Sequence, residues 1–350
     1  MEMKAKKRDI SCDVIKAVTS LCVVFCHVNF YFAFSEGASL WHDVLSAVFA
    51  DEAGIFFLAA GFFLYNNTDY LKLLKKSAIR VALPGVAMMI ITQLFFERTI
   101  GPEFILSVLT FRETGIYWFV YAYLWVMIFF PFFKGAADFL NEGDSDKKYK
   151  IFMIVTFILL IINDCFKNSV FGFSFEGLTV MIPAGLETLW GMIVYKMNER
   201  FKERKVAFAA AAGFAGVTAV RVILIRILEN YGGGGYLRAW ETSFGFVCAS
   251  LFCIFVISLT SSESASSRAS VKLVADLGTY AYTVYLVHPF ILRVAKDCGL
   301  FETLKRYNGN PVLYYVALYL AVGIVAYMAA LAISAVLRKI TNIIKGIFNK

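Results

Sequence analysis

Apolar runs long enough to cross a lipid bilayer recur along the whole of this 350-residue chain. A helix needs about 20 predominantly apolar residues to span the hydrocarbon core, and ten segments approach that length. Only helices and closed barrels can satisfy their backbone hydrogen bonds inside lipid. We therefore expect an all-α integral membrane protein, a polytopic bundle of about ten transmembrane helices that forms one domain over residues 1–350. The expected spans are 14–34, 44–65, 79–98, 116–134, 150–166, 178–197, 206–228, 243–260, 279–296 and 312–337.

The positive charge of the chain is distributed so as to predict its orientation. The net charge is +8, and the basic residues gather in every second connection between the apolar runs. Cytoplasmic loops carry such an excess, so both termini are expected on the cytoplasmic side, and nucleic acid is not expected as a partner. Residues 338–350 form a basic amphipathic tail that we expect on the anionic inner leaflet. The basic connections include Lys72, Lys75, Lys76 and Arg80; Lys147, Lys148 and Lys150; and Arg200, Lys202, Arg204 and Lys205.

Two ionisable residues, Lys16 and His27, lie inside the first apolar run. Ionisable side chains at membrane depth are costly, so each is a functional hypothesis. Eleven residues make about three helical turns and rise about 16 Å, which places both on one helix face at different depths. His27 is suited to act as a general base, or else it forms an interhelical hydrogen bond. Asp13 can pair with Lys16 at i, i+3, either to orient a site or as a neutralised interface pair.

Other polar residues lie in or beside the expected spans, and His288 and Glu52 have two interpretations each. His288 lies about ten residues into the ninth span, so it can meet His27 near the midplane, or it can bond a buried tyrosine such as Tyr285. Glu52 either binds an acceptor or marks the outer interface. Arg226 is expected to pair with Glu229 at i, i+3. His42 falls in an expected outer loop and receives no role. Cys22, Cys26 and His27 do not share one helix face, so no metal site is expected.

Four segments together resemble the membrane acyltransferase-3 family. The first is Asp13-x-x-Lys16-Ala-x9-His27, and the second is Phe56-Phe57-Leu-Ala-Ala-Gly61, which is similar to an FFxxSG motif. Lys75-Lys76-Ser-Ala-Ile-Arg80-Val-Ala-Leu-Pro84 resembles a basic RxxR segment followed by proline. Leu277-Gly-Thr-Tyr-Ala-Tyr-Thr-Val-Tyr285-Leu-Val-His288-Pro289 resembles an SYxIYLxH signature. Tyr117-Trp118-Phe119, with Pro131 at the end of the same span, is more weakly similar to a WF…P segment of the family. Ser77 stands where the first arginine of RxxR is expected, so either Lys76 replaces it or the anion site is weaker or different.

The resemblance implies an activity. It points to an O-acyltransferase of the bacterial cytoplasmic membrane that uses acyl-CoA, most simply acetyl-CoA, and acylates a hydroxyl of an envelope glycan or lipid-linked sugar. It assigns catalysis to His27, Lys16 and Asp13, and substrate binding to Arg80, Lys76, His288, Tyr285 and Trp118. Glu52 is added to the substrate-binding residues from its charge and position alone. The alternative is a transporter for an amino acid or small metabolite, because a similar domain is fused to vancomycin-resistance serine racemases.

Overall fold

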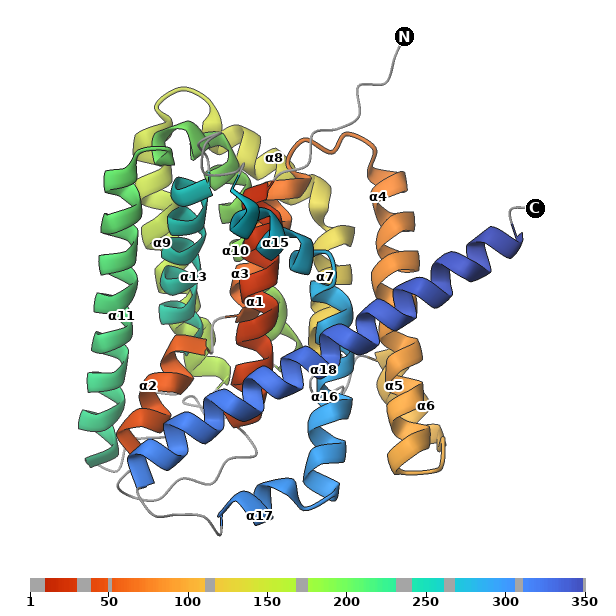
Figure 1. Cartoon of the computed structure of the whole chain (residues 1–350). Coiled ribbons are helices and arrows are strands. Elements are labelled where there is room, and N and C mark those ends of the chain that lie inside the picture. Colours follow the sequence, from red (N-terminus) through yellow and green to blue (C-terminus); the bar gives the residue numbers. More distant parts are fainter. Residues whose placement is uncertain are drawn as a thin grey trace.

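The structure, a computed structural model, describes residues 10–29, 39–49, 52–110, 117–167, 176–230, 241–260, 268–305 and 311–348. Every regular element in these ranges is a helix, as the sequence predicts (Figure 1). The longer helices are α1 (Ile10–Asn29), α3 (Glu52–Leu64), α5 (Leu83–Phe96), α9 (Ser145–Lys167), α10 (Glu176–Met197), α11 (Arg204–Asn230), α13 (Glu241–Thr260), α16 (Ala281–Asp297) and α18 (Pro311–Phe348). The shorter ones are α2 (Ser39–Phe49), α4 (Tyr70–Ser77), η2 (Ala78–Ala82), α6 (Pro102–Thr110), α7 (Trp118–Ile128), α8 (Phe130–Asn141), η4 (Asn198–Phe201), α15 (Ala269–Gly278) and α17 (Leu300–Lys305).

Each expected span coincides with helical residues, but the count of ten spans is not confirmed. In the described part of the chain, six helices are long and apolar enough to cross a membrane. The α7–α8 pair adds a seventh only if its 63° bend is counted within one span. Helix α16 has 17 residues, which rise about 26 Å and fall short of a typical hydrocarbon core. The orientation of the termini stays a prediction.

The segment expected as a basic loop before the third span is helical instead. Helices α4, η2 and α5 follow one another without a break from Tyr70 to Phe96. Asp69 begins this path as an N-cap, because its side chain accepts the Lys72 N–H at 3.0 Å. The η2 segment is a wider π-turn that ends at Ala82, two residues before Pro84, which cannot donate a backbone hydrogen bond. The basic residues therefore lie on a helix that continues into the span.

Helix α1 lies at the centre of the molecule. Figure 1 shows it between α13 and α16, with α18 crossing obliquely in front. The described residues form three apolar clusters, and α1 contributes to all of them: Val23 to the first, Ile15 to the second and Val24 to the third. A polar residue on α1 is therefore surrounded by protein on several sides.

Glycines let two helix pairs approach backbone to backbone. Gly61 of α3 lies against the Thr188 carbonyl of α10, and Gly191 of α10 lies against the Leu58 carbonyl of α3. A Cβ at either glycine would overlap the facing carbonyl. Gly278, at the end of α15, lies against the Asp13 carbonyl of α1 in the same way. Small residues at such crossings are the usual means of close helix packing in membranes.

Candidate active site

A pair of buried imidazoles joins α1 to α16. The Nε2 atom of His288 lies 3.0 Å from the Nδ1 atom of His27, and the ring centroids are 4.9 Å apart. His288 is fully buried, and 8% of His27 is exposed. The sequence predicted that these residues, 261 positions apart, can meet, and the structure brings them into contact. Their chemical role stays a prediction.

Each imidazole also contacts its own helix. The Nδ1 atom of His27 lies 2.9 Å from the Val23 carbonyl, and the Nδ1 atom of His288 lies 3.1 Å from the Val284 carbonyl. Each contact joins the ring to the carbonyl four residues earlier in the same helix, so it fixes the orientation of the ring. The pair is thus fixed both within each helix and between the helices.

A row of aromatic rings extends from the histidine pair toward α7. Tyr285 lies one turn before His288, and their ring centroids are 6.0 Å apart. Phe119 of α7 lies 5.3 Å from Tyr285 and 6.3 Å from Trp118. Of the residues predicted to bind substrate, Tyr285 therefore lies next to the pair and Trp118 lies further along the row. The hydrogen-bond contacts of His288 join it to His27 and to the Val284 carbonyl.

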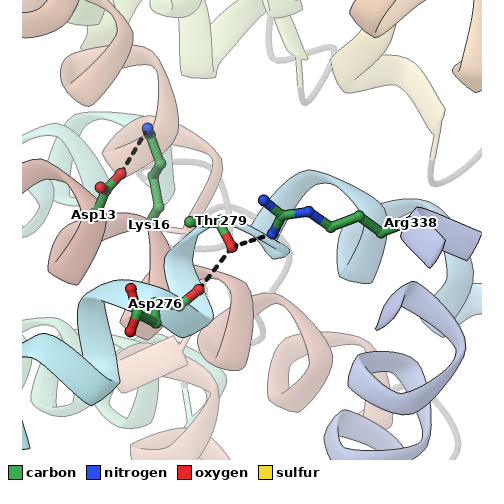
Figure 2. Close-up of polar contacts among 5 residues, drawn as sticks. All are labelled: Asp13, Lys16, Asp276, Thr279 and Arg338. Carbon is green, nitrogen blue, oxygen red and sulfur yellow. Dashed lines mark hydrogen bonds and ion pairs between the residues drawn. The ribbon is translucent and has the colours of Figure 1, made fainter. Parts of the chain in front are cut away.

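Lys16 and Asp13 form the predicted i, i+3 ion pair near the start of α1, with 3.2 Å between Nζ and Oδ1 (Figure 2). The Lys16 ammonium also lies over the Phe63 ring at 4.1 Å from its centroid. Beside the pair, Arg338 of α18 donates to the Thr279 hydroxyl at 3.0 Å (Figure 2). Since Lys16 and His27 are about 16 Å apart along α1, Lys16 does not lie where the histidines meet.

Arg80 and Lys76 lie elsewhere, on the helical path from α4 to α5. Both side chains are exposed. In Figure 1 this path stands at the edge of the molecule, with α7 and α16 between it and α1. Ser77 differs from its neighbour: it is buried, and it hydrogen-bonds Tyr123 of α7. Lys76 therefore points in another direction and does not fill the place of residue 77. Whether Lys76 replaces the expected arginine in binding an anion stays a prediction.

Sequence reasoning missed Tyr282 of α16. It connects α16 to the helical path from α4 to α5, which carries Lys76 and Arg80 and is called the basic helix below. Its hydroxyl donates to the Val81 carbonyl in the π-turn at 2.5 Å. Its ring is stacked on Tyr285, with centroids 6.1 Å apart. The signal was present, because Tyr282 lies inside the segment that resembles the SYxIYLxH signature. What the sequence did not reveal was its partner, 201 positions earlier in the chain.

The predicted outer loop at His42 is also wrong, because His42 lies on α2. Its Nδ1 atom is 2.8 Å from the Tyr315 hydroxyl, which donates to Asn29 Oδ1 at 2.8 Å. The expected pairing of Arg226 with Glu229 stays a prediction, because the Glu229 side chain lies outside the described residues. The Arg226 Nε atom is 2.7 Å from the carboxylate of Asp43 on α2.

Glu52 and the metal-ligating residue types remain to be placed in the structure. Glu52 is the first residue of α3, but its side chain lies outside what the structure describes, so its predicted role is untested. Among the described residues, no group of three or more His, Cys, Asp or Glu side chains is arranged to hold a metal ion. The candidate site therefore consists of the histidine pair, the aromatic row and the more distant cations.

These features define a multi-pass helical membrane protein whose central helices share a buried pair of imidazoles. A family model described as "Acyltransferase domain" matches residues 9–343, which is nearly the whole chain. The chain therefore belongs to the acyltransferase-3 family. The comparisons with curated proteins and with solved structures found no match.

Proposed function

We propose that this protein is an O-acyltransferase of the bacterial cytoplasmic membrane. It transfers an acyl group, in the simplest case acetyl, from acyl-CoA to a hydroxyl of an envelope glycan or lipid-linked sugar. The observation that carries the proposal is the contact of 3.0 Å between His27 and His288, buried at the centre of a member of an acyltransferase family.

In the proposed reaction, His27 acts as general base. The acceptor hydroxyl oxygen attacks the thioester carbonyl carbon while a ring nitrogen of His27 takes the hydroxyl proton. The new C–O bond forms and the C–S bond breaks. The CoA thiolate then takes from the imidazolium the proton that came from the hydroxyl. The products are an ester and free CoA, and no other reactant is consumed. Imidazole suits both proton transfers because its ordinary pKa lies near neutrality.

The cations are assigned to the phosphate-bearing end of the donor. Lys16 lies about 16 Å from His27 along α1, too far to touch the reacting carbonyl. Acyl-CoA carries its phosphates and its thioester at opposite ends of the pantetheine arm, so a cation at this distance suits the phosphates. Arg80 and Lys76 are exposed on the basic helix and available for the same purpose. Asp13 orients Lys16 through their ion pair.

The other candidates are assigned to substrate binding. Tyr285 and Trp118 lie on the aromatic row that leads away from His288, where apolar ring faces suit the acyl chain or a sugar ring. Glu52 is assigned to the acceptor because of its place at the start of α3.

An assay of CoA release tests the proposal. Purified protein in detergent is incubated with acetyl-CoA labelled in the acetyl group and with an envelope extract, and both CoA and labelled product are measured. We expect His27→Ala to lower turnover by roughly 100-fold or more. The matched control is His42→Ala, which removes a histidine that lies on α2 and should keep wild-type turnover.

Each variant is first shown to be folded by its size-exclusion profile and its circular dichroism. Full turnover by folded His27→Ala would contradict the role of His27. Negligible CoA release by the wild type, together with uptake of an amino acid into liposomes that contain it, would identify a transporter instead.

A further inference from the structure

The contacts around the two imidazoles determine which nitrogens carry hydrogen. A backbone carbonyl oxygen can only accept a hydrogen bond, so a ring nitrogen that faces one must donate. Nδ1 of His27 faces the Val23 carbonyl at 2.9 Å, and Nδ1 of His288 faces the Val284 carbonyl at 3.1 Å. Each ring therefore carries its hydrogen on Nδ1, an assignment made from the hydrogen-bond partners.

Pro289 strengthens this assignment for His288. In a regular helix the N–H of residue 289 would donate to the Tyr285 carbonyl, but proline has no N–H. The His288 side chain hydrogen-bonds that carbonyl instead. The Nδ1 hydrogen of His288 thus has the Val284 carbonyl as its acceptor. The neutral ring then has its lone pair on Nε2, the atom that faces α1.

The two rings are complementary in this form. The lone pair of His288 Nε2 meets the Nδ1 hydrogen of His27 across 3.0 Å. If the His27 hydrogen were on Nε2, the lone pair of its Nδ1 would face two acceptors, at 2.9 Å and 3.0 Å. Two protonated rings would bring two positive charges together in an interior of low dielectric, which is also unfavourable. Among the arrangements of two neutral rings, only one leaves each contact with one donor and one acceptor.

We propose that His288 is a positioning residue that holds His27 in the Nδ1–H tautomer, so that Nε2 of His27 is the base. This inference rests on the proposed acyl transfer. When Nε2 of His27 takes the hydroxyl proton, its Nδ1–H bond to His288 becomes charge-assisted and therefore stronger. The CoA thiolate then takes the proton from Nε2, and His288 keeps its own hydrogen throughout.

The tautomers are measurable without any substrate. The chain has three histidines, so protein labelled with ¹⁵N-histidine gives few ring signals, and His42→Gln identifies the third ring. We expect both His27 and His288 to show a protonated Nδ1 and an unprotonated Nε2. We expect His288→Gln to preserve the His27 tautomer, because the glutamine amide oxygen can accept in place of Nε2. His288→Leu removes one of the two acceptors and leaves only the Val23 carbonyl, so we expect a larger share of the Nε2–H tautomer of His27 than in the wild type.

Turnover provides the second readout. In His288→Leu we expect kcat to fall roughly 100-fold, while the KM for acetyl-CoA changes less than about threefold. His288→Gln should recover most of the loss, which a role in packing alone would not predict. Equal kcat in the leucine and glutamine variants, or a His27 hydrogen found on Nε2 in the wild type, would overturn the inference. If His27→Ala kept full CoA release, the proposed function would fail while the tautomer measurement still stood.

Discussion

Replacement of Gly61 by alanine tests how closely α3 and α10 approach each other. A Cβ at Gly61 would overlap the Thr188 carbonyl, and a Cβ at Gly191 would overlap the Leu58 carbonyl. Both obstacles are helix backbone, so no change of rotamer relieves the overlap. The two helices must move apart instead.

The free energy of unfolding that is lost follows from this separation. A gap of about 0.5–1 Å forfeits a quarter to a half of each dispersion contact, and each atom pair contributes about 0.1–0.2 kcal/mol. Two facing leucine-sized side chains make roughly 100 such contacts, so with about 0.15 kcal/mol per pair and about a quarter of it forfeited, about 4 kcal/mol is lost. The higher helix propensity of alanine returns at most about 1 kcal/mol. We expect Gly61→Ala to be destabilised by about 3 kcal/mol, at the upper end of overpacking costs.

An SDS titration followed by tryptophan fluorescence measures this quantity in detergent. The matched control is Gly216→Ala on α11, where a Cβ would meet nothing within 4 Å. We expect this control to be unchanged or stabilised by up to about 1 kcal/mol. The double variant Gly61→Ala, Gly191→Ala should lose less free energy of unfolding than the two single variants combined, because the helices separate only once. If Gly61→Ala unfolds at the same SDS concentration as the control, the close approach of the two helices is wrong.

Three further predictions concern polar contacts. Asp164→Ala removes the carboxylate that accepts the Ser243 N–H at 3.0 Å at the start of α13, and we expect a loss of about 1–2 kcal/mol in the same titration; Asp164→Asn should lose less. Tyr282→Phe removes the hydrogen bond to the π-turn, so we expect a loss of about 0.5–1.5 kcal/mol and, if the basic helix binds the donor, a higher KM for acetyl-CoA. Asp43→Asn breaks the pair with Arg226, which is one-third exposed, so the loss should stay below about 1 kcal/mol and shrink at high salt.

The sequence predicted well what depends on a single helix. The separation of Lys16 and His27, and the pairing of Lys16 with Asp13, follow from helical periodicity alone. The meeting of His27 with His288 followed from their similar depths in two apolar runs. The all-helical class followed from the length of these runs.

The predictions from sequence were wrong for polar segments, which can be either loops or exposed helix turns. The basic segment around Lys76 and the polar start of the second span at His42 were expected as loops, but both are helical. Charged residues are found on exposed helix turns as well as in loops, so composition does not separate the two. Contacts between distant residues were also missed, such as the pairing of Arg226 with Asp43.

The residues of the late signature lie on α16 at three-residue intervals, and each contacts a different helix. Tyr282 bonds the π-turn beside Arg80, Tyr285 packs on Phe119 of α7, and His288 meets His27 of α1. Steps of three residues keep the side chains on one broad face of the helix and raise each about 4.5 Å beyond the last. Stacking of Tyr282 on Tyr285 makes this row continuous.

Helix α16 therefore sets the depth of the histidine pair relative to the basic helix. If Arg80 holds the phosphates of the donor, as proposed, this fixed offset determines how far the thioester must reach to meet His27. The spacing of the signature then has a geometric role, because insertion of one residue between Tyr282 and His288 would rotate the imidazole about 100° away from α1.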